Sequence, residues 1–273
     1  MMTPDPAALP PLPPRPARPA SFGDLPETEV ALLGYVAEMY GLQMDQLAAL
    51  LRDWGEPAGS AADRARELVA RWRAAGLADS EELTLGEPWV WASAKCLDAC
   101  GMRTKLVKPA TLTLRHVHAV AEVRLAVERT SAHRRSQARW QPERSIVAGR
   151  FPARHGHVPD GEVHYPAGTG APWAGETWAV EVELSRKSVA RVAAIMQATL
   201  DRTGDFATPP GSYAVPGQPP RYDRVVYLAS PTSVLTVLNA RGEVGSPQSA
   251  RVEVYELPDS MLRLNAPKKG RQP

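Results

Sequence analysis

The stretch TWAVEVEL, residues 177–184, followed by SRKSVARVAAIMQATLDRT, residues 185–203, decides the fold class. The first segment alternates and is rich in valine, which predicts a central β-strand. In the second segment apolar residues recur at helical spacing, which predicts a helix over Lys187–Thr203. A strand followed directly by a helix is the repeating unit of an α/β sheet.

The rest of the C-terminal half continues this alternation. Short strands are predicted at 145–150 and 157–165, and a buried strand at 225–229. A helix is predicted at 232–240 and a last strand at 251–257. We therefore expect an α/β domain over residues 140–260.

The N-terminal half predicts a different arrangement. Apolar residues recur at helical spacing around 30–40, 44–51 and 60–76, and Ser60 is a plausible N-cap for the third of these helices. Two short extended segments, 77–85 and 89–93, follow with a turn between them. Three helices and then a hairpin is the order of a winged helix-turn-helix, which gives an α+β chain overall.

Charge is concentrated in the middle of the chain. Residues 1–110 hold 11 basic and 15 acidic side chains, residues 111–155 hold 9 and 3, and residues 156–273 hold 12 and 12. A basic belt of this kind suits a phosphate backbone. The alternative is a solvated helix face on which arginines are incidental.

Three acidic residues form the strongest constellation. Asp160, in Pro159-Asp160-Gly161, lies at the turn before one predicted strand, and Glu181 and Glu183 lie two apart on the next. Residues two apart project from one sheet face. Asp160 and Glu181 would then hold Mg²⁺ or Mn²⁺ together with waters and a phosphate oxygen, and Glu183 could be a further ligand. The alternative is a common Asp-Gly turn beside a solvated strand.

These residues resemble a known family. The order PDG … AVEVELSRKS followed by a helix is similar to the PD-(D/E)xK nuclease superfamily. Residues 24–240 resemble actinobacterial mobile-element proteins of the replication-relaxation type, which pair a winged helix with a restriction-endonuclease-like domain. The supporting segments are VWASAKCLDACG (90–101), RHVHAVAEVRLAVER (115–129), WQPERSI (140–146) and VVYLASPTSVLTVL (225–238).

The resemblance implies roles for single residues. Asp160 matches the first acidic residue of the superfamily, Glu181 the second, and Glu143 an acidic residue on the preceding helix. The lysine expected two places after Glu181 is replaced by Glu183, and Lys187 would supply its charge from the start of the following helix. This departure bears directly on activity, because that lysine orients the attacking water.

DNA contacts are expected from two groups of arginines. The third predicted helix carries Arg64, Arg71 and Arg73, and would face a major groove. The basic belt carries Arg134, Arg135 and Arg139. An interaction with proteins instead of DNA is the alternative for the N-terminal domain.

The expected organisation has five parts. They are a disordered Pro-rich tail (1–23), a winged helix-turn-helix domain (24–108), a basic helical connector (109–139), a nuclease-like domain (140–260) and a disordered tail (261–273). We expect neither a signal peptide nor a membrane span, and therefore a cytoplasmic location.

Cysteine and histidine pairs suggest weaker hypotheses. Cys96 and Cys100 are expected to be buried thiols rather than a disulfide or a zinc site. His116 and His118 match the letters of a relaxase metal motif, but a helix there would turn the two rings apart. His155 and His157 could share a strand face, although the sequence offers no third ligand.

Two functions follow from these patterns. The first is a DNA-binding replication or relaxation factor of a plasmid or integrative element, acting as a Mg²⁺- or Mn²⁺-dependent nickase and working with protein partners of that plasmid or conjugative element. The second is a non-enzymatic transcription or copy-control regulator in which the nuclease-like domain is a relic. The replacement of the lysine by Glu183 separates the two hypotheses.

Overall fold

The structure is a computed structural model. It describes residues 22–83, 86–102, 108–147, 156–170, 173–203 and 220–262, except for the side chains of residues 131, 132 and 135. The expected tails therefore lie almost entirely outside the described residues, as do all residues from 204 to 219. Helices and two sheets occur together in the chain, which confirms the mixed α+β fold class.

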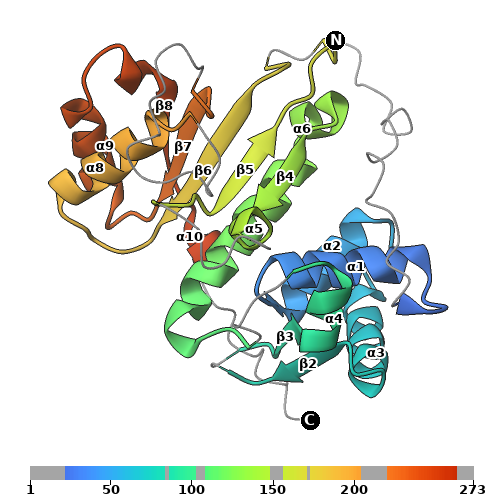
Figure 1. Cartoon of the computed structure of the whole chain (residues 1–273). Coiled ribbons are helices and arrows are strands. Elements are labelled where there is room, and N and C mark those ends of the chain that lie inside the picture. The colour runs from blue at the N-terminus through green and yellow to red at the C-terminus, as the bar shows by residue number, and fades with distance from the viewer. Residues whose placement is uncertain are drawn as a thin grey trace. The chain divides into compact units, whose positions relative to one another are not determined.

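The chain divides into two compact units, coloured along the sequence in Figure 1. The N-terminal unit comprises the described parts of Ala17–Val123, Arg144–Pro152 and Leu257–Pro273. The C-terminal unit comprises the described parts of Arg124–Glu143 and Ala153–Glu256.

Helices and a small antiparallel sheet make up the N-terminal unit. Its elements are α1 (Glu27–Glu38), β1 (Leu42–Gln43), α2 (Met44–Asp53), α3 (Ala61–Ala74), β2 (Ala78–Glu81), β3 (Trp89–Ala92), α4 (Ala94–Ala99), the 3-10 helix η3 (Thr111–Thr113), the first part of α5 (Leu114–Arg129) and α10 (Asp259–Leu262). The sheet order is β1-β3-β2, so β3 lies between the other two strands. The expected helices and hairpin are present, and β1 is an additional strand.

Large apolar side chains fill this unit. Trp72 on α3, Trp89 on β3 and Leu33 on α1 are fully buried. Trp89 and Trp91 pack against Leu114 at the start of α5. Burial of several tryptophans and leucines, each worth about 1.5–3 kcal/mol for a large apolar side chain, is the main stabilising contribution here.

The C-terminal unit is built on a five-stranded mixed sheet. Its elements are the end of α5, α6 (Ser131–Ser136), β4 (Arg139–Pro142), the start of α7 (Glu143–Val147), β5 (Gly161–His164), β6 (Thr177–Glu183), α8 (Val189–Leu200), β7 (Arg224–Ala229), α9 (Val234–Glu243), the 3-10 helix η4 (Gln248–Arg251) and β8 (Val252–Glu256). The order is β4-β5-β6-β7-β8; the first two pairs are antiparallel and the last two parallel. Helices α8 and α9 pack on each other and on β7 (Figure 1).

The register determines which side chains share a face of this sheet. Glu162 on β5 pairs with Ala179 on β6, and Glu181 pairs with Tyr227 on β7. Because side chains alternate along a strand, Glu162, Glu181, Glu183 and Tyr227 all lie on one face. This face is unusually rich in polar groups for a largely buried sheet.

Two expectations of secondary structure are wrong. Residues 145–147, expected in a strand, belong to α7. Pro142 ends β4, and Glu143 then begins the helix, where an acidic residue suits the positive end of the helix dipole. The single helix expected at 111–135 is divided at Thr130, whose hydroxyl accepts the N–H of His133 and starts α6.

The predicted helix cap and thiols have different outcomes. The side chain of Ser60 makes no cap hydrogen bond; its hydroxyl donates to Glu56 instead. Cys96 and Cys100 are free thiols, the first buried and the second half-buried.

Within the described ranges no helix has the length and apolar character that a membrane span requires.

Candidate functional site

The C-terminal unit brings Asp160, Glu181 and Glu183 together; we call these three residues the acidic cluster. Asp160 lies immediately before β5, and its Oδ2 accepts the backbone N–H of Val182 at 2.7 Å. Val182 stands between the two glutamates of β6. The hydrogen bond therefore fixes the Asp160 carboxylate beside the strand that carries Glu181 and Glu183.

Glu181 has a histidine partner. The Nε2 of His157 lies 2.7 Å from its Oε1, and the Glu181 side chain is 8% exposed against 35% for His157. Burial opposes the charged imidazole, but the charge and hydrogen bond of Glu181, with Asp160 behind it, raise the pKa of His157 above its ordinary value. His157 thus approaches the cluster from the solvent side.

The same surroundings act on Glu181. Burial raises the pKa of Glu181 and the nearby Asp160 carboxylate raises it further, while His157 and Lys187 oppose the change. The pKa of Glu181 is raised overall. The positive charges of His157 and Lys187 therefore do not fully offset the effects of burial and of the Asp160 carboxylate. Repulsion between Asp160 and Glu181 thus acts in the direction expected of two adjacent carboxylates, although burial is the larger cause.

Glu183 is held by a different set of partners. Its Oε1 accepts the backbone N–H and hydroxyl of Ser185 at 3.2 and 3.1 Å, and its Oε2 lies 2.5 Å from the Nζ of Lys187. Lys187 lies before α8 rather than on it, because the helix begins at Val189 with Ser188 as its cap. The lysine charge is thus directed to Glu183.

Glu143 reaches the site through its backbone. Its N–H donates to the carbonyl oxygen of Asp160 at 3.0 Å, which joins the start of α7 to the turn before β5. All five residues expected to carry chemistry therefore belong to one neighbourhood. Asp160, Glu181 and Glu183 present carboxylates to it, Lys187 presents an ammonium, and Glu143 a backbone contact.

A second buried carboxylate on the same face has very different surroundings. Glu162 is fully buried, and its two oxygens accept hydrogen bonds from Arg221 at 2.9 and 3.0 Å and from Tyr222 at 2.6 Å. Burial opposes its charged form, but the donors of His164, Tyr222 and Arg221 outweigh this and hold the pKa of Glu162 below its usual range. Glu162 is thus stabilised in its charged form, whereas the pKa of Glu181 is raised.

The sequence did not single out Tyr227, and it did not connect His157 with the acidic cluster. Tyr227 lies opposite Glu181 in the register of β6 and β7, and the burial of its ring leaves it 2% exposed. The sequence suggests His157 only as a pair with His155, which lies outside the described residues. The position of His157 three residues before Asp160, in the same turn, is the signal that could have found it.

We searched the described residues for groups of at least three metal-binding side chains. No group of three or more His, Cys, Asp or Glu side chains there is arranged to hold a metal ion. His116 and His118 both lie on α5, as expected, and the side chain of His118 is buried. Asp160 and Glu181, the predicted pair of metal ligands, both belong to the acidic cluster.

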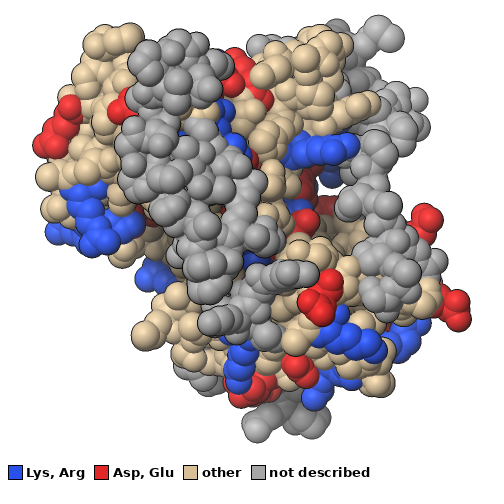
Figure 2. All heavy atoms as spheres, viewed as in Figure 1, with Lys and Arg blue, Asp and Glu red and all other residues tan. Residues whose placement is uncertain are grey.

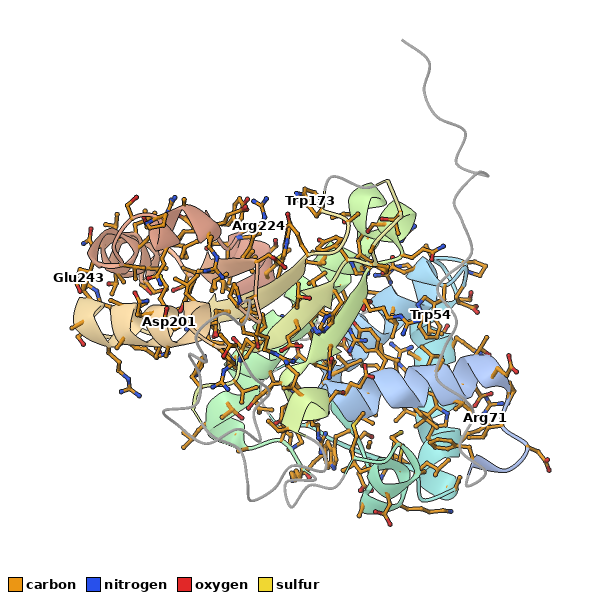
Figure 3. All side chains as sticks on the ribbon, turned by 45° about the horizontal axis from the view of Figure 1, so that its top comes forward. Trp54, Arg71, Trp173, Asp201, Arg224 and Glu243 are labelled. Atoms are coloured by element: carbon orange, nitrogen blue, oxygen red, sulfur yellow. The ribbon has the colours of Figure 1, made fainter. Side chains whose placement is uncertain are left out.

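The arginines of α3 have unequal surroundings. Arg71, labelled in Figure 3, pairs with the buried carboxylate of Glu29 on α1 at 2.6 Å, and the indole of Trp72 donates to the same carboxylate. Arg64 pairs with Glu67 at 3.3 Å. Arg73 is exposed near the C-terminal end of the helix. Arg71 and Arg73 are thus both exposed, and the guanidinium of Arg71 is engaged by a buried carboxylate.

The arginines of the basic belt differ in their exposure to solvent. Arg124 is 6% exposed and its Nε donates to Glu128 at 2.9 Å. The Nε of Arg134 donates to the carbonyl oxygen of Glu128 at 3.3 Å, Arg139 is exposed on β4, and the side chain of Arg135 lies outside the described residues. On the face visible in Figure 2, basic and acidic side chains are interspersed and form no broad surface of one sign among the described residues.

Comparisons of the chain with protein-family models, with curated proteins and with solved structures found no match.

Proposed function

We propose that this chain is a DNA-binding factor of the mobile-element replication-relaxation type, whose acidic cluster holds Mg²⁺ or Mn²⁺ and nicks the DNA backbone. One observation carries this proposal: the 2.7 Å bond between the Asp160 carboxylate and Val182 N–H, which fixes Asp160 beside Glu181. A carboxylate from the turn before β5 and one from the adjacent strand β6 match the arrangement that the resemblance implies.

The donor chemistry fits a hard divalent cation. Mg²⁺ is commonly bound through one or two carboxylates and keeps several waters, so Asp160 and Glu181 suffice without a third protein ligand. The raised pKa of Glu181 reports a buried carboxylate that lacks enough nearby positive charge. When bound, such a cation polarises a phosphate and lowers the pKa of a bound water.

Other residues of the site would orient and neutralise the carboxylates of the acidic cluster. His157 orients Glu181 through its 2.7 Å hydrogen bond and stays accessible to solvent. Lys187 compensates Glu183, which keeps the ammonium close to the cluster. The carboxylate of Glu183 is engaged by Ser185 and Lys187, so we assign it no metal-binding role.

The order of elements supports a role for the N-terminal unit in binding DNA. Helices α1, α2 and α3 are followed by the β2–β3 hairpin, and β1 joins β3 to complete a small sheet. This order is the one expected of a winged helix-turn-helix. We propose that α3 lies against the major groove and that Arg73 contacts the DNA backbone there.

A non-enzymatic regulator is the second candidate, and a specific observation favours it. Glu183 occupies the position of the expected lysine, and the 2.5 Å ion pair directs Lys187 toward Glu183 rather than toward a water or phosphate. In that case the C-terminal unit would bind DNA or a protein without cleaving it.

Two measurements on the purified chain separate these candidates. The first is the thermal midpoint by calorimetry with and without millimolar MgCl₂ or MnCl₂, since a ligand that binds only the native state stabilises it by mass action. The second is the conversion of supercoiled plasmid to open circles. We expect metal stabilisation and nicking in the parent chain, and neither in Asp160→Asn or Glu181→Gln. Glu243→Gln, on the exposed end of α9, is the matched control and should behave like the parent.

Each outcome has a clear meaning. Metal stabilisation without nicking supports the regulator with an intact cation site, and Glu183→Lys then tests whether the missing lysine accounts for the loss. Absence of any metal effect in the parent chain contradicts the metal-dependent nickase. A mobility-shift assay on DNA from the gene's own neighbourhood tests DNA binding separately from both results.

A further inference from the structure

The hydroxyl of Tyr227 is buried and has no hydrogen-bond partner among the described residues. Tyr227 stands in the middle of β7 and is 2% exposed. A buried phenol normally finds a partner, because leaving the hydroxyl unsatisfied forfeits the hydrogen bonds that it makes with water in the unfolded chain. An unsatisfied buried hydroxyl in a native structure calls for an explanation, and a ligand at the polar face of the sheet would supply the missing partner.

The register shows where this hydroxyl belongs. Tyr227 pairs with Glu181 across the parallel strands β7 and β6, so the two side chains are neighbours on one face. A tyrosine phenol keeps its proton at neutral pH, so this hydroxyl is able to donate a hydrogen bond on that face.

The carboxylates themselves do not use this donor. Glu181 is bonded by His157, Glu183 by Ser185 and Lys187, and Asp160 by the N–H of Val182. A hydroxyl can donate one hydrogen bond and accept others. A hydrated divalent cation on Asp160 and Glu181 would bring water or phosphate oxygens into the same space, and these oxygens accept hydrogen bonds.

We infer that the Tyr227 hydroxyl contacts an oxygen ligand held at the acidic cluster, either a water of the hydrated cation or a phosphate oxygen of the DNA backbone. This inference rests on the proposed metal site. It adds a neutral donor on β7 that fixes the orientation of the ligand. It assigns Tyr227 to ligand contact rather than to holding the metal.

The test compares the parent chain with Tyr227→Phe, which removes only the hydroxyl. Calorimetric midpoints and metal titrations are measured in two arms, MgCl₂ alone and MgCl₂ with the dinucleotide thymidylyl-(3′,5′)-thymidine. We expect the variant without metal to be at least as stable as the parent, and its affinity to fall about 2- to 10-fold, the range of one hydrogen bond. Tyr35→Phe, a buried tyrosine of the N-terminal unit, is the matched control and should leave both arms unchanged.

The possible outcomes test the role of Tyr227 separately from the proposed metal site. Weaker binding in the MgCl₂ arm supports a water ligand, and weaker binding only with the dinucleotide supports a phosphate oxygen. Equal affinities in parent and variant overturn the role of Tyr227 but leave the metal site standing, whereas a parent chain with no metal response overturns both. If Tyr227→Phe does not fold, the ¹³Cζ resonance of Tyr227 in the parent must shift when MgCl₂ or the dinucleotide is added; an unmoved resonance overturns the inference.

Discussion

Single buried side chains of this protein differ sharply in how well their charge is compensated. Glu162 receives donors from Arg221 and Tyr222 and its pKa is lowered, while Glu181 receives one histidine and its pKa is raised. Both lie on the same face of one sheet. Perturbed pKa values cluster at functional sites, and the raised pKa of Glu181 is one reason for our proposal that the chemistry occurs there.

His133 allows a test of buried charge away from the candidate site. It is 8% exposed on α6, and burial, with the nearby Arg124 and Arg134, lowers its pKa to about 4. In the unfolded chain histidine titrates near 6.5, so between these two values only the unfolded state binds the proton. The stability that His133 contributes is therefore complete above about pH 6.5 and is lost as the pH falls toward about 4.

We expect His133→Gln to weaken the pH dependence of unfolding in that window. The free energy of unfolding of the parent should fall by up to about 3 kcal/mol more than that of the variant between neutral pH and pH 4. Urea unfolding across the range measures this difference. His116→Gln, on α5, serves as the control. Parallel curves for parent and His133→Gln would show that the pKa of His133 is the same in the native and unfolded states.

At the scale of elements, the sequence predicted most of what local patterns determine. The strand at 177–184 and the following helix are confirmed as β6 and α8, and the N-terminal helices and hairpin are present. The sequence did not reveal β1 or β4, which are short and acquire their pairing from strands far along the chain. Strand pairing is a tertiary property, and a two-residue strand leaves no periodicity to detect.

The candidate site shows the same division. Alternation along β6 predicted that Glu181 and Glu183 share a face, and the structure places them so. The ion pair of Glu183 with Lys187 and the position of Tyr227 could not be predicted, because they depend on where the chain turns after β6 and on the register of β7. The spacing of residues along one strand tells which side chains share a face. Their partners on other strands can be identified only when the pairing of the strands is known.

Gly161 connects this local chemistry to the packing of β4 and β5. The sequence explains the glycine as part of a Pro-Asp-Gly turn, but in the structure it stands at the start of β5 against the ring of Trp140. A Cβ at this position would overlap atoms of the indole ring. The glycine is therefore required by an aromatic side chain on the neighbouring strand, and not by turn conformation alone.

We expect Gly161→Ala to destabilise the chain by about 1–3 kcal/mol, the usual cost of forcing extra volume into a packed site. Thermal or urea unfolding measures the loss. The smaller ring in Trp140→Phe should relieve the overlap, so that the double variant is no less stable than Trp140→Phe alone. If the two losses simply add, the collision with Trp140 is not the cause. A stable Gly161→Ala chain would also show that β4 can shift away from β5.

For the molecule as a whole, the proposal requires both units to meet one DNA. Arg73 on α3 and Arg139 on β4 are exposed basic residues, one in each unit. Other arginines are engaged within the protein, including Arg224, which pairs with Glu176 and Glu253 and lies over Trp178 (Figure 3). Net charge alone is thus a poor guide to the proposed DNA-binding surface. Substitution of the exposed arginines Arg73 and Arg139 tests that surface more directly.

Substituting each of the two exposed arginines by glutamine should remove one phosphate contact. Each lost contact reduces the slope of log K against log salt by about 0.9, so Arg73→Gln and Arg139→Gln should each lower the slope by that amount and the double variant by about 1.8. Arg191→Gln, exposed on α8, removes the same charge and should leave the slope unchanged. Fluorescence anisotropy with a labelled duplex between 50 and 200 mM salt, roughly the range over which such contacts dominate, gives the slopes. If only Arg73→Gln changes the slope, Arg139 makes no phosphate contact and the predicted role of the basic belt loses this support. If only Arg139→Gln does, Arg73 makes no phosphate contact and the assignment of α3 to the DNA loses this support.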